Sequence, residues 1–147
     1  MLNHVIEKES VYRGYEYVVV IQKMGHRCGY IAIPQGHFLY GKTAADKRIN
    51  NISCHGGITF VNGGHNCTYP IDSNDLWWIG FDCMHSFDGR DFEAAKGYYS
   101  HDLEALREVE SWKKAFANYP YEAKSLRFCV AECESIIDQI EEMRDNL

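Results

Sequence analysis

The pattern of apolar and polar residues predicts four β-strands in the first 81 residues. Residues 15–22 (YEYVVVIQ) and 28–33 (CGYIAI) are rich in β-branched and aromatic side chains, which predicts two buried strands that form a hairpin. Residues 55–61 (HGGITFV) predict a third strand opened by two glycines, and residues 76–81 (LWWIGF) predict a fourth. We expect a small, mainly antiparallel sheet whose strands follow one another in sequence order.

The spacing of apolar residues changes to a helical period in the last third of the chain. Residues 102–119 and 121–144 have this period, and Pro120 interrupts it. The second segment carries an apolar stripe with charged residues between its members: Leu126, Phe128, Val130, Cys133, Ile136, Ile137, Ile140 and Met143. We therefore expect an α+β fold in which a long helix over residues 122–143 packs on the sheet.

Length and composition favour a single domain over residues 1–147. The chain is 46% hydrophobic, which is enough for a core, and no internal repeat is visible. We expect the sheet and the loops that carry the site at about residues 15–90, and the helical part at about residues 100–147. If the apolar stripe is wider than one sheet face, part of it would mediate homo-oligomer formation.

The charge of the chain excludes some partners. The net charge is −6, with nine Lys/Arg and ten Asp/Glu up to Tyr99, and six Lys/Arg and eleven Asp/Glu after it. This distribution lacks the basic footprint of a protein that binds duplex nucleic acid. The nearly neutral N-terminal part is still compatible with a small anionic ligand.

The sequence predicts a cytoplasmic protein with free thiols and no membrane partner. No segment approaches the roughly 18 apolar residues of a membrane span, and the N-terminus (MLNHVIEKES) does not resemble a signal peptide. The six cysteines are therefore expected to be reduced. Cys129 and Cys133 are four residues apart in the predicted helix, which places them on one face as core residues.

Three segments combine glycine with histidine, aspartate or aromatic residues at the ends of predicted strands. They are residues 25–42 (GHRCGYIAIPQGHFLYGK), 55–60 (HGGITF) and 77–89 (WWIGFDCMHSFDG). Glycine permits positive φ angles and close approach to a ligand, and loops on a rigid sheet are common places for sites. We therefore expect these three segments to converge at one end of the sheet.

These motifs resemble a family of small uncharacterised proteins of bacteriophages and prophages. The similarity includes GHRCGYIAIP, the G-H-x-x-Y-G-K loop, HGG[IL]T[FY] and WW[IF]GFDCxH, and it extends from about Tyr15 into the C-terminal helix. The resemblance implies a phage context, in which small proteins often counter host defences and some bind or destroy nucleotide second messengers. The chain departs from the family pattern after His85, where Ser86-Phe87-Asp88-Gly89 replaces a small residue followed by Gly-Asp.

Several kinds of chemistry are compatible with these segments. His55, Asp82, Cys83 and His85 are suitable metal ligands, but their spacing matches no recognised zinc motif, so we expect no metal and no cofactor. His55 or His85 beside Asp82 would provide acid–base catalysis. A cysteine nucleophile would need a histidine close in space, and Cys28, Cys54 and Cys83 each have one close in sequence.

Binding of a nucleotide-like anion is the remaining interpretation. Backbone N–H groups of the two glycines would contact a phosphate, basic residues would add positive charge, and an aromatic ring would stack on the base. Trp77 and Trp78 are neighbours on a strand and point to opposite faces, so at most one of them lines the site. The expected ligand-binding residues are Arg27, His37, Tyr40, Lys42, His55, Gly56, Gly57, Trp78, Asp82 and His85.

The sequence leaves three functions open. The first is a phage-encoded binding protein that sequesters a nucleotide second messenger and so counters host defence. The alternative is a small hydrolase or lyase that acts on a nucleotide-like ligand through His55, Asp82 and His85. The third is a protein-binding inhibitor of a host factor that uses the acidic surface.

Overall fold

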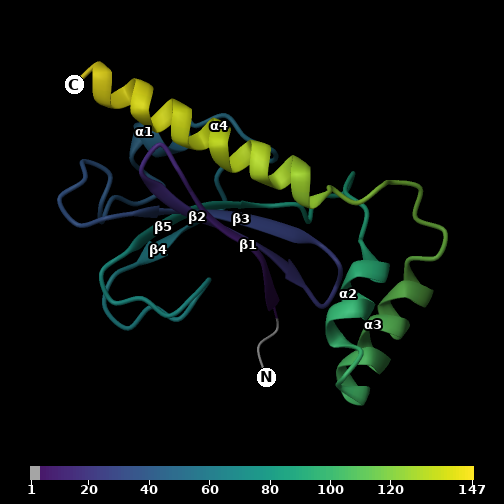
Figure 1. The fold of residues 1–147 in the computed structure, drawn as a ribbon. Coiled ribbons are helices and arrows are strands. Elements are labelled where there is room, and N and C mark those ends of the chain that lie inside the picture. Colours follow the sequence, from purple (N-terminus) through teal and green to yellow (C-terminus); the bar gives the residue numbers. More distant parts are fainter. Residues whose placement is uncertain (1–3) are drawn as a thin grey trace.

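A five-stranded antiparallel sheet with a long helix across one face forms the centre of the computed structural model, which describes residues 4–147 (Figure 1). The α+β prediction and the packing of the C-terminal helix on the sheet are confirmed. The elements in chain order are β1 (His4–Tyr12), β2 (Tyr15–Gln22), β3 (Arg27–Ile33), α1 (Lys47–Asn50), β4 (Phe60–Gly63), β5 (Trp77–Asp82), α2 (Phe92–Tyr99), α3 (Leu103–Ala115) and α4 (Leu126–Asp145).

The strands do not follow sequence order across the sheet. The order is β1-β2-β3-β5-β4, so β5 lies between β3 and β4 and pairs with both. Cys28 at the start of β3 is opposite Asp82 at the end of β5, and Ile33 at the end of β3 is opposite Trp77. The expected sequential order is therefore wrong, and the loop after β3 lies at the opposite end of the sheet from the loop after β5.

The first strand was not expected from the sequence. β1 is an edge strand with charged residues in its middle, so its apolar signal is weak. It joins β2 through Arg13 and Gly14, whose φ angles of 50° and 84° give the two-residue turn that suits a twisted hairpin. The predicted third strand is shorter than expected, because β4 begins only at Phe60, residues 55 and 56 form a turn, and residues 57–59 are irregular.

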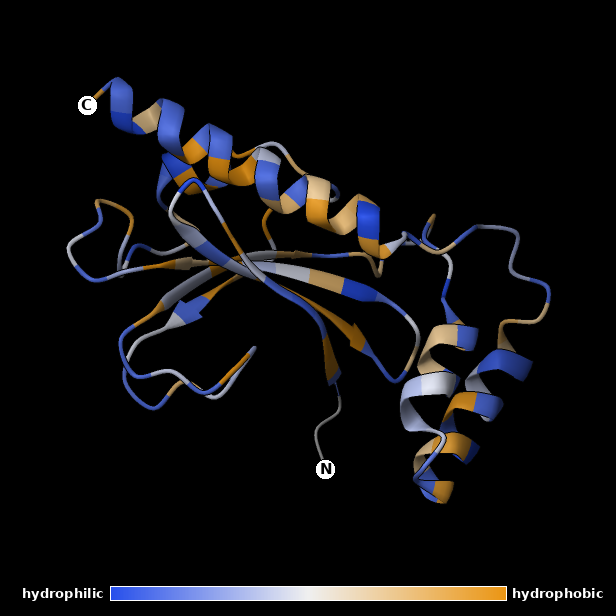
Figure 2. Cartoon of the chain, viewed as in Figure 1, coloured by the Kyte–Doolittle hydropathy of each residue, from blue (hydrophilic) through white to orange (hydrophobic). Residues whose placement is uncertain are grey.

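Helix α4 buries its apolar stripe against the sheet. Figure 2 shows apolar residues along the side of α4 that faces the strands and hydrophilic residues on the outer side. Ile136, Ile137 and Ile140 are fully buried in a cluster with residues of β2, β3 and β5. Cys129 and Cys133 are also fully buried, which confirms them as core residues.

The opposite face of the sheet is covered by the loop that connects β4 to β5. Trp78 is fully buried there with Val20 and Tyr30, and Tyr69 and Ile71 from the loop pack against them. The Trp78 indole N–H donates to Ser73 Oγ. Because both faces are covered, the exposed groups of the sheet are restricted to its ends and edges.

A buried ion-pair network fastens the α2–α3 pair to the sheet, beyond the end where β5 finishes (Figure 1). The Arg27 guanidinium pairs with Glu7 at 2.6 Å and with Asp91 at 2.9 Å, and the side chains of Arg27 and Glu7 are only 6% and 3% exposed. Asp91 caps the N-terminus of α2 through the Ala94 N–H. Among residues 4–147 no helix is long and apolar enough to cross a membrane.

We predict that Arg27→Ala lowers the free energy of unfolding by about 3–5 kcal/mol, because it leaves the Glu7 carboxylate buried without its partner. Urea denaturation followed by circular dichroism measures this loss. The exposed Arg107 is the matched control, since Arg107→Ala should change stability by less than about 0.5 kcal/mol. Equal effects of the two substitutions would contradict a structural role of Arg27.

We also predict acid destabilisation through His26. Burial, followed by the charge of Arg90, lowers the pKa of His26 to about 4, and its Nδ1 accepts a hydrogen bond from Arg90. The unfolded chain then binds a proton at higher pH than the folded chain, so stability is complete above about pH 6.5 and falls as the pH drops toward 4. The loss at pH 4 should be about 3 kcal/mol. Denaturant titrations at several pH values should show a flatter pH dependence for His26→Gln; an unchanged profile would contradict the prediction.

Candidate functional site

Two histidines and an aspartate meet where β5 ends. One potential ligand atom from each of His55, His85 and Asp88 lies within 4.8 Å of the other two. His55 comes from the turn before β4, and the other two residues come from the loop after β5. The antiparallel pairing of β4 with β5 brings these two segments to the same end of the sheet.

Asp88 is the most deeply buried member of the cluster, with a side chain that is 0% exposed. Both of its carboxylate oxygens are 2.9 Å from Nε2 of His55, and the backbone N–H of His85 donates to one of them at 3.0 Å. The side chain of His55 is 10% exposed. This pair therefore lies largely away from solvent and is held in one orientation.

Asp82 and His85 form the outer part of the site. The side chains of Asp82 and His85 are 30% and 25% exposed, and Asp82 Oδ1 lies 3.5 Å from His85 Nε2. The Thr59 hydroxyl donates to Asp82 Oδ2 at 2.7 Å, and the Met84 N–H donates to Oδ1 at 3.0 Å. Asp82 is thus fixed by two donors while it remains accessible to a ligand.

The glycine that follows His55 makes room for His85. A Cβ atom on Gly56 would lie 1.9 Å from Nε2 of His85, and the φ angle of Gly56 is +70°. Gly57 also has a positive φ, of +79°, but a Cβ there would meet no atom within 4 Å. Gly56 is therefore required for the close approach of the two imidazoles, whereas Gly57 is required only for the positive φ angle of the turn.

Aromatic rings surround the two imidazoles. The His55 and His85 ring centroids are 5.5 Å apart, and Phe128 of α4 packs edge-on against His55. Phe87 stacks on His85 with an interplanar angle of 15° and is 48% exposed. The site thus carries an open flat surface beside its polar groups.

The charges around the cluster favour a cation more than an anion. The His55 N–H donates to Glu132 of α4 and the Gly57 N–H donates to the carbonyl of Cys54, so these two groups are already occupied. The carboxylates of Asp82 and Asp88 add negative charge, and neither makes an ion pair with a Lys or Arg side chain in the part of the chain that the structure describes. The expected phosphate cradle of backbone N–H groups is not formed by His55 and Gly57.

Three of the expected rim residues lie at the other end of the sheet. The Lys42 carbonyl accepts a hydrogen bond from Trp77, and Tyr40 packs against the same indole at the start of β5, roughly 16 Å from its end. His37 contacts Tyr15, whose hydroxyl donates to Glu141 near the C-terminal end of α4. The placement of His37, Tyr40 and Lys42 around the site is wrong, because it assumed the sequential strand order.

Two further expected ligand-binding residues are structural. Arg27 lies at the correct end of the sheet, but its guanidinium is buried in ion pairs with Glu7 and Asp91. Trp78 is fully buried under the loop between β4 and β5 and offers no ring to a ligand. The structure does bring His55, Gly56, Asp82 and His85 together, and Gly57 lies in the same turn.

Asp88 is the residue of the cluster that sequence reasoning missed. It stands three residues after His85, and its Oδ2 accepts the backbone N–H of His85, which closes the loop around the site. An Asp-Gly pair after a strand is a turn signal, and this signal by itself does not point to a ligand. The residue that closes the loop after His85 is therefore a candidate functional residue.

Cysteine nucleophiles are disfavoured by the environment of the thiols. Burial raises the pKa of Cys54 and of Cys28 to about 12. The contact with the Cys129 thiol, followed by burial, raises the pKa of Cys83 as well. Thiolates are the reactive form, so these cysteines are weak nucleophiles at neutral pH. That all six thiols are free in the purified protein stays a prediction.

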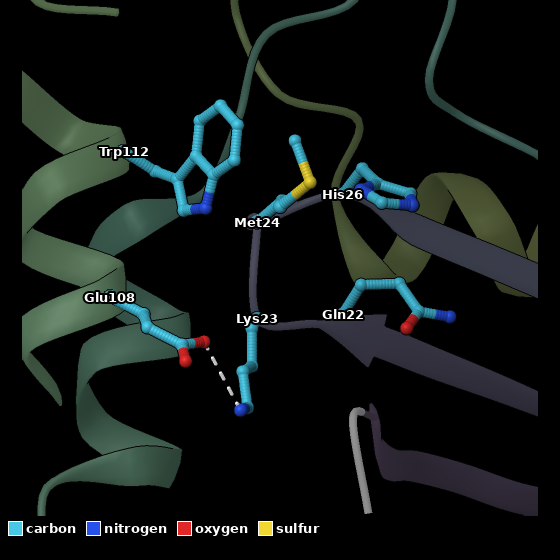
Figure 3. A pocket seen from close by; sticks show the side chains of 6 residues that line it. All are labelled: Gln22, Lys23, Met24, His26, Glu108 and Trp112. Carbon is cyan, nitrogen blue, oxygen red and sulfur yellow. Dashed lines mark hydrogen bonds and ion pairs between the residues drawn. The ribbon is translucent and has the colours of Figure 1, made fainter. Parts of the chain in front are cut away.

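A separate hollow lies between the β2–β3 turn and α3 (Figure 3). It has a volume of about 300 Å³ and is lined by Gln22, Lys23, Met24, His26, Glu108 and Trp112. Lys23 and Glu108 pair with each other at 3.2 Å across it, so its two charges are already neutralised. None of the expected ligand-binding residues lines this hollow.

Comparison with known proteins gives no matching family model, no matching curated protein and no matching solved structure. The resemblance to phage proteins therefore stays a prediction.

We predict that Gly56→Ala displaces the His85 ring, whereas Gly57→Ala does not. Both substitutions should cost about 1–2 kcal/mol of stability, because both positions have positive φ. Only the first places a Cβ against the imidazole. The His85 ring-proton shifts in an NMR spectrum measure the difference, and equal shifts in both variants would contradict the geometry.

Proposed function

We propose that the chain is a small hydrolase or lyase that acts on a nucleotide-like ligand at the site formed by His55, His85, Asp82 and Asp88. The observation that supports this is the placement of two imidazoles and two carboxylates within one contact network at a strand end. Here Asp82 and His85 remain partly exposed.

The division of burial suggests a division of roles. His55 and Asp88 are held in the interior, where they bind and polarise a water or a substrate oxygen together with His85. Asp82, which is more exposed and anchored by Thr59, accepts the proton that this water or substrate releases. Charged groups fixed in position before the reaction lower its barrier, because they need not reorganise.

The ring beside the site supports a nucleotide-like ligand. Phe87 is 48% exposed and lies parallel to His85, so a flat heterocycle can stack on it. The non-catalytic sponge predicts the same contact, but it also needs donors for the phosphate. The N–H of Gly57, which was expected to provide one of them, donates to Cys54, the neighbouring N–H of His55 donates to Glu132, and the expected arginine is buried. The missing donors count against tight capture of a phosphate by this turn, and the partly exposed Asp82–His85 pair favours the enzyme.

The experiment is to incubate the protein with cyclic mononucleotides, cyclic dinucleotides and nucleoside triphosphates, denature it, and identify the products by mass spectrometry. The enzyme predicts a new product whose amount grows with time. Binding followed by recovery of intact nucleotide would support the sponge. The absence of both would favour the protein-binding inhibitor.

We predict that Asp82→Asn lowers kcat/KM for the substrate found in this way by about 10²–10⁴-fold, which is the usual effect of losing an acid–base group. His55→Ala removes a polarising group and should lower it by about 10²–10³-fold. His101 is exposed, so His101→Ala is the matched control and should retain activity. Far-UV circular dichroism checks that each variant is folded. Full activity of folded Asp82→Asn would contradict the assigned role.

A further inference from the structure

We infer that His55, His85 and Asp88 bind a divalent transition-metal ion of the zinc class. This inference deepens the proposed function, because it names the group that polarises the water or substrate. It also stands on geometry of its own, so metal binding can be measured without any substrate.

The geometry fits an ion with three protein ligands. Zinc binds imidazole nitrogen at about 2.0–2.1 Å and carboxylate oxygen at about 2.0–2.2 Å, so its ligand atoms lie only a few ångströms apart. The candidate atoms of His55, His85 and Asp88 all lie within 4.8 Å of one another. Small rotations of the side chains bring three such atoms onto one ion.

The burial of Asp88 supports a cation. Its side chain is 0% exposed, and among residues 4–147 its partners are the His55 ring and the His85 N–H. A buried carboxylate is costly unless a positive charge or several donors compensate it. Glu132 lies beside His55 and adds further negative charge. A divalent ion bound between His55, His85 and Asp88 would compensate the negative charge of these carboxylates.

The shape of the turn supports the same conclusion independently. Gly56 combines a φ of +70° with a position where any Cβ would overlap the His85 ring. This contact brings the ring of His85 to 5.5 Å from that of His55. A loop that only had to close would not need two imidazoles so near each other.

Three ligands leave a coordination position open, which is typical of catalytic zinc and not of structural zinc. The open position would face Asp82, because the Asp82 carboxylate lies 3.5 Å from His85 and its side chain is the most exposed among His55, Asp82, His85 and Asp88. Bound zinc lowers the pKa of water to about 7. Asp82 is then placed to take the proton, and it is not a ligand.

The donor set selects the type of ion. Imidazole suits Zn²⁺, Fe²⁺, Ni²⁺ and Cu²⁺, whereas Mg²⁺ and Ca²⁺ prefer oxygen ligands alone. Co²⁺ takes the same geometry as Zn²⁺ and absorbs visible light, so it is the probe for this site. Mg²⁺ serves as the negative control.

The test is a Co²⁺ titration of chelator-treated full-length protein, followed by competition with Zn²⁺. We expect one Co²⁺ per chain with a visible absorption band, displacement by Zn²⁺, and no effect of Mg²⁺. His85→Ala should weaken Zn²⁺ affinity by more than about 100-fold, beyond the loss caused by an outer-shell partner. His101→Ala should bind normally.

Asp88→Asn changes a buried carboxylate and can alter folding. The metal site is therefore tested with His85→Ala and Asp82→Asn. Asp82→Asn should bind Zn²⁺ within about tenfold of the unchanged protein and lose activity, since Asp82 is an outer-shell group. Absence of Co²⁺ or Zn²⁺ binding, or equal binding by folded His85→Ala, would overturn the inference.

Two results separate the metal site from the proposed function. Nucleotide turnover that persists after chelation would reject the metal and leave the hydrolase standing. Stoichiometric Zn²⁺ binding that His85→Ala abolishes, with no turnover of any nucleotide, would establish the metal site and reject the hydrolase.

Discussion

The pairing of β5 between β3 and β4 determines where every chemically important group lies. Antiparallel pairing places the end of β5 next to the residues that precede β4, since Phe60 is opposite Gly80. The turn with His55 and the loop with His85 therefore meet, although 30 residues separate them. The same pairing sends the loop after β3 to the other end of the sheet. The position of β5 between β3 and β4 thus separates His37 from His55 and His85.

Helix α4 is the third element that contributes side chains to the site, beside the turn before β4 and the loop after β5. Its N-terminal half contributes Phe128 and Glu132, which contact His55. Its C-terminal half, about 20 Å along the helix, contributes Glu141, which contacts Tyr15, and Tyr15 in turn contacts His37. The buried isoleucines between these ends fix the helix on the sheet. The burial that stabilises the fold therefore also positions the groups around His55. Substitutions in the middle of α4 would disturb both regions.

The sequence predicts the locally encoded parts of this structure well. The strands at residues 15–22 and 28–33 and the helix near 122–143 have strong periodicity, and all three are present. β1 was missed because an exposed edge strand can carry charge at many positions. Strand order could not be read, because it depends on long-range contacts and not on residue type. Because the strand order was wrong, the predicted location of His37, Tyr40 and Lys42 was wrong as well. The predicted proximity of His55 and Asp82 was right, because β4 and β5 are neighbours in the expected order and in the observed one.

Asp88 shows most clearly why the site is more than a set of loop caps. Local rules place an ionised carboxylate at the surface or beside a Lys or Arg, and Asp88 has neither environment. Natural proteins tolerate such conflicts mainly where function requires them. Arg27 provides the contrast within the same chain, because its burial is compensated by two carboxylates and by the Lys124 carbonyl. A buried ionisable group that the fold pairs fully, as it pairs Arg27, has a structural role, whereas a buried carboxylate whose partners are one imidazole and one backbone N–H is open to a ligand of opposite charge.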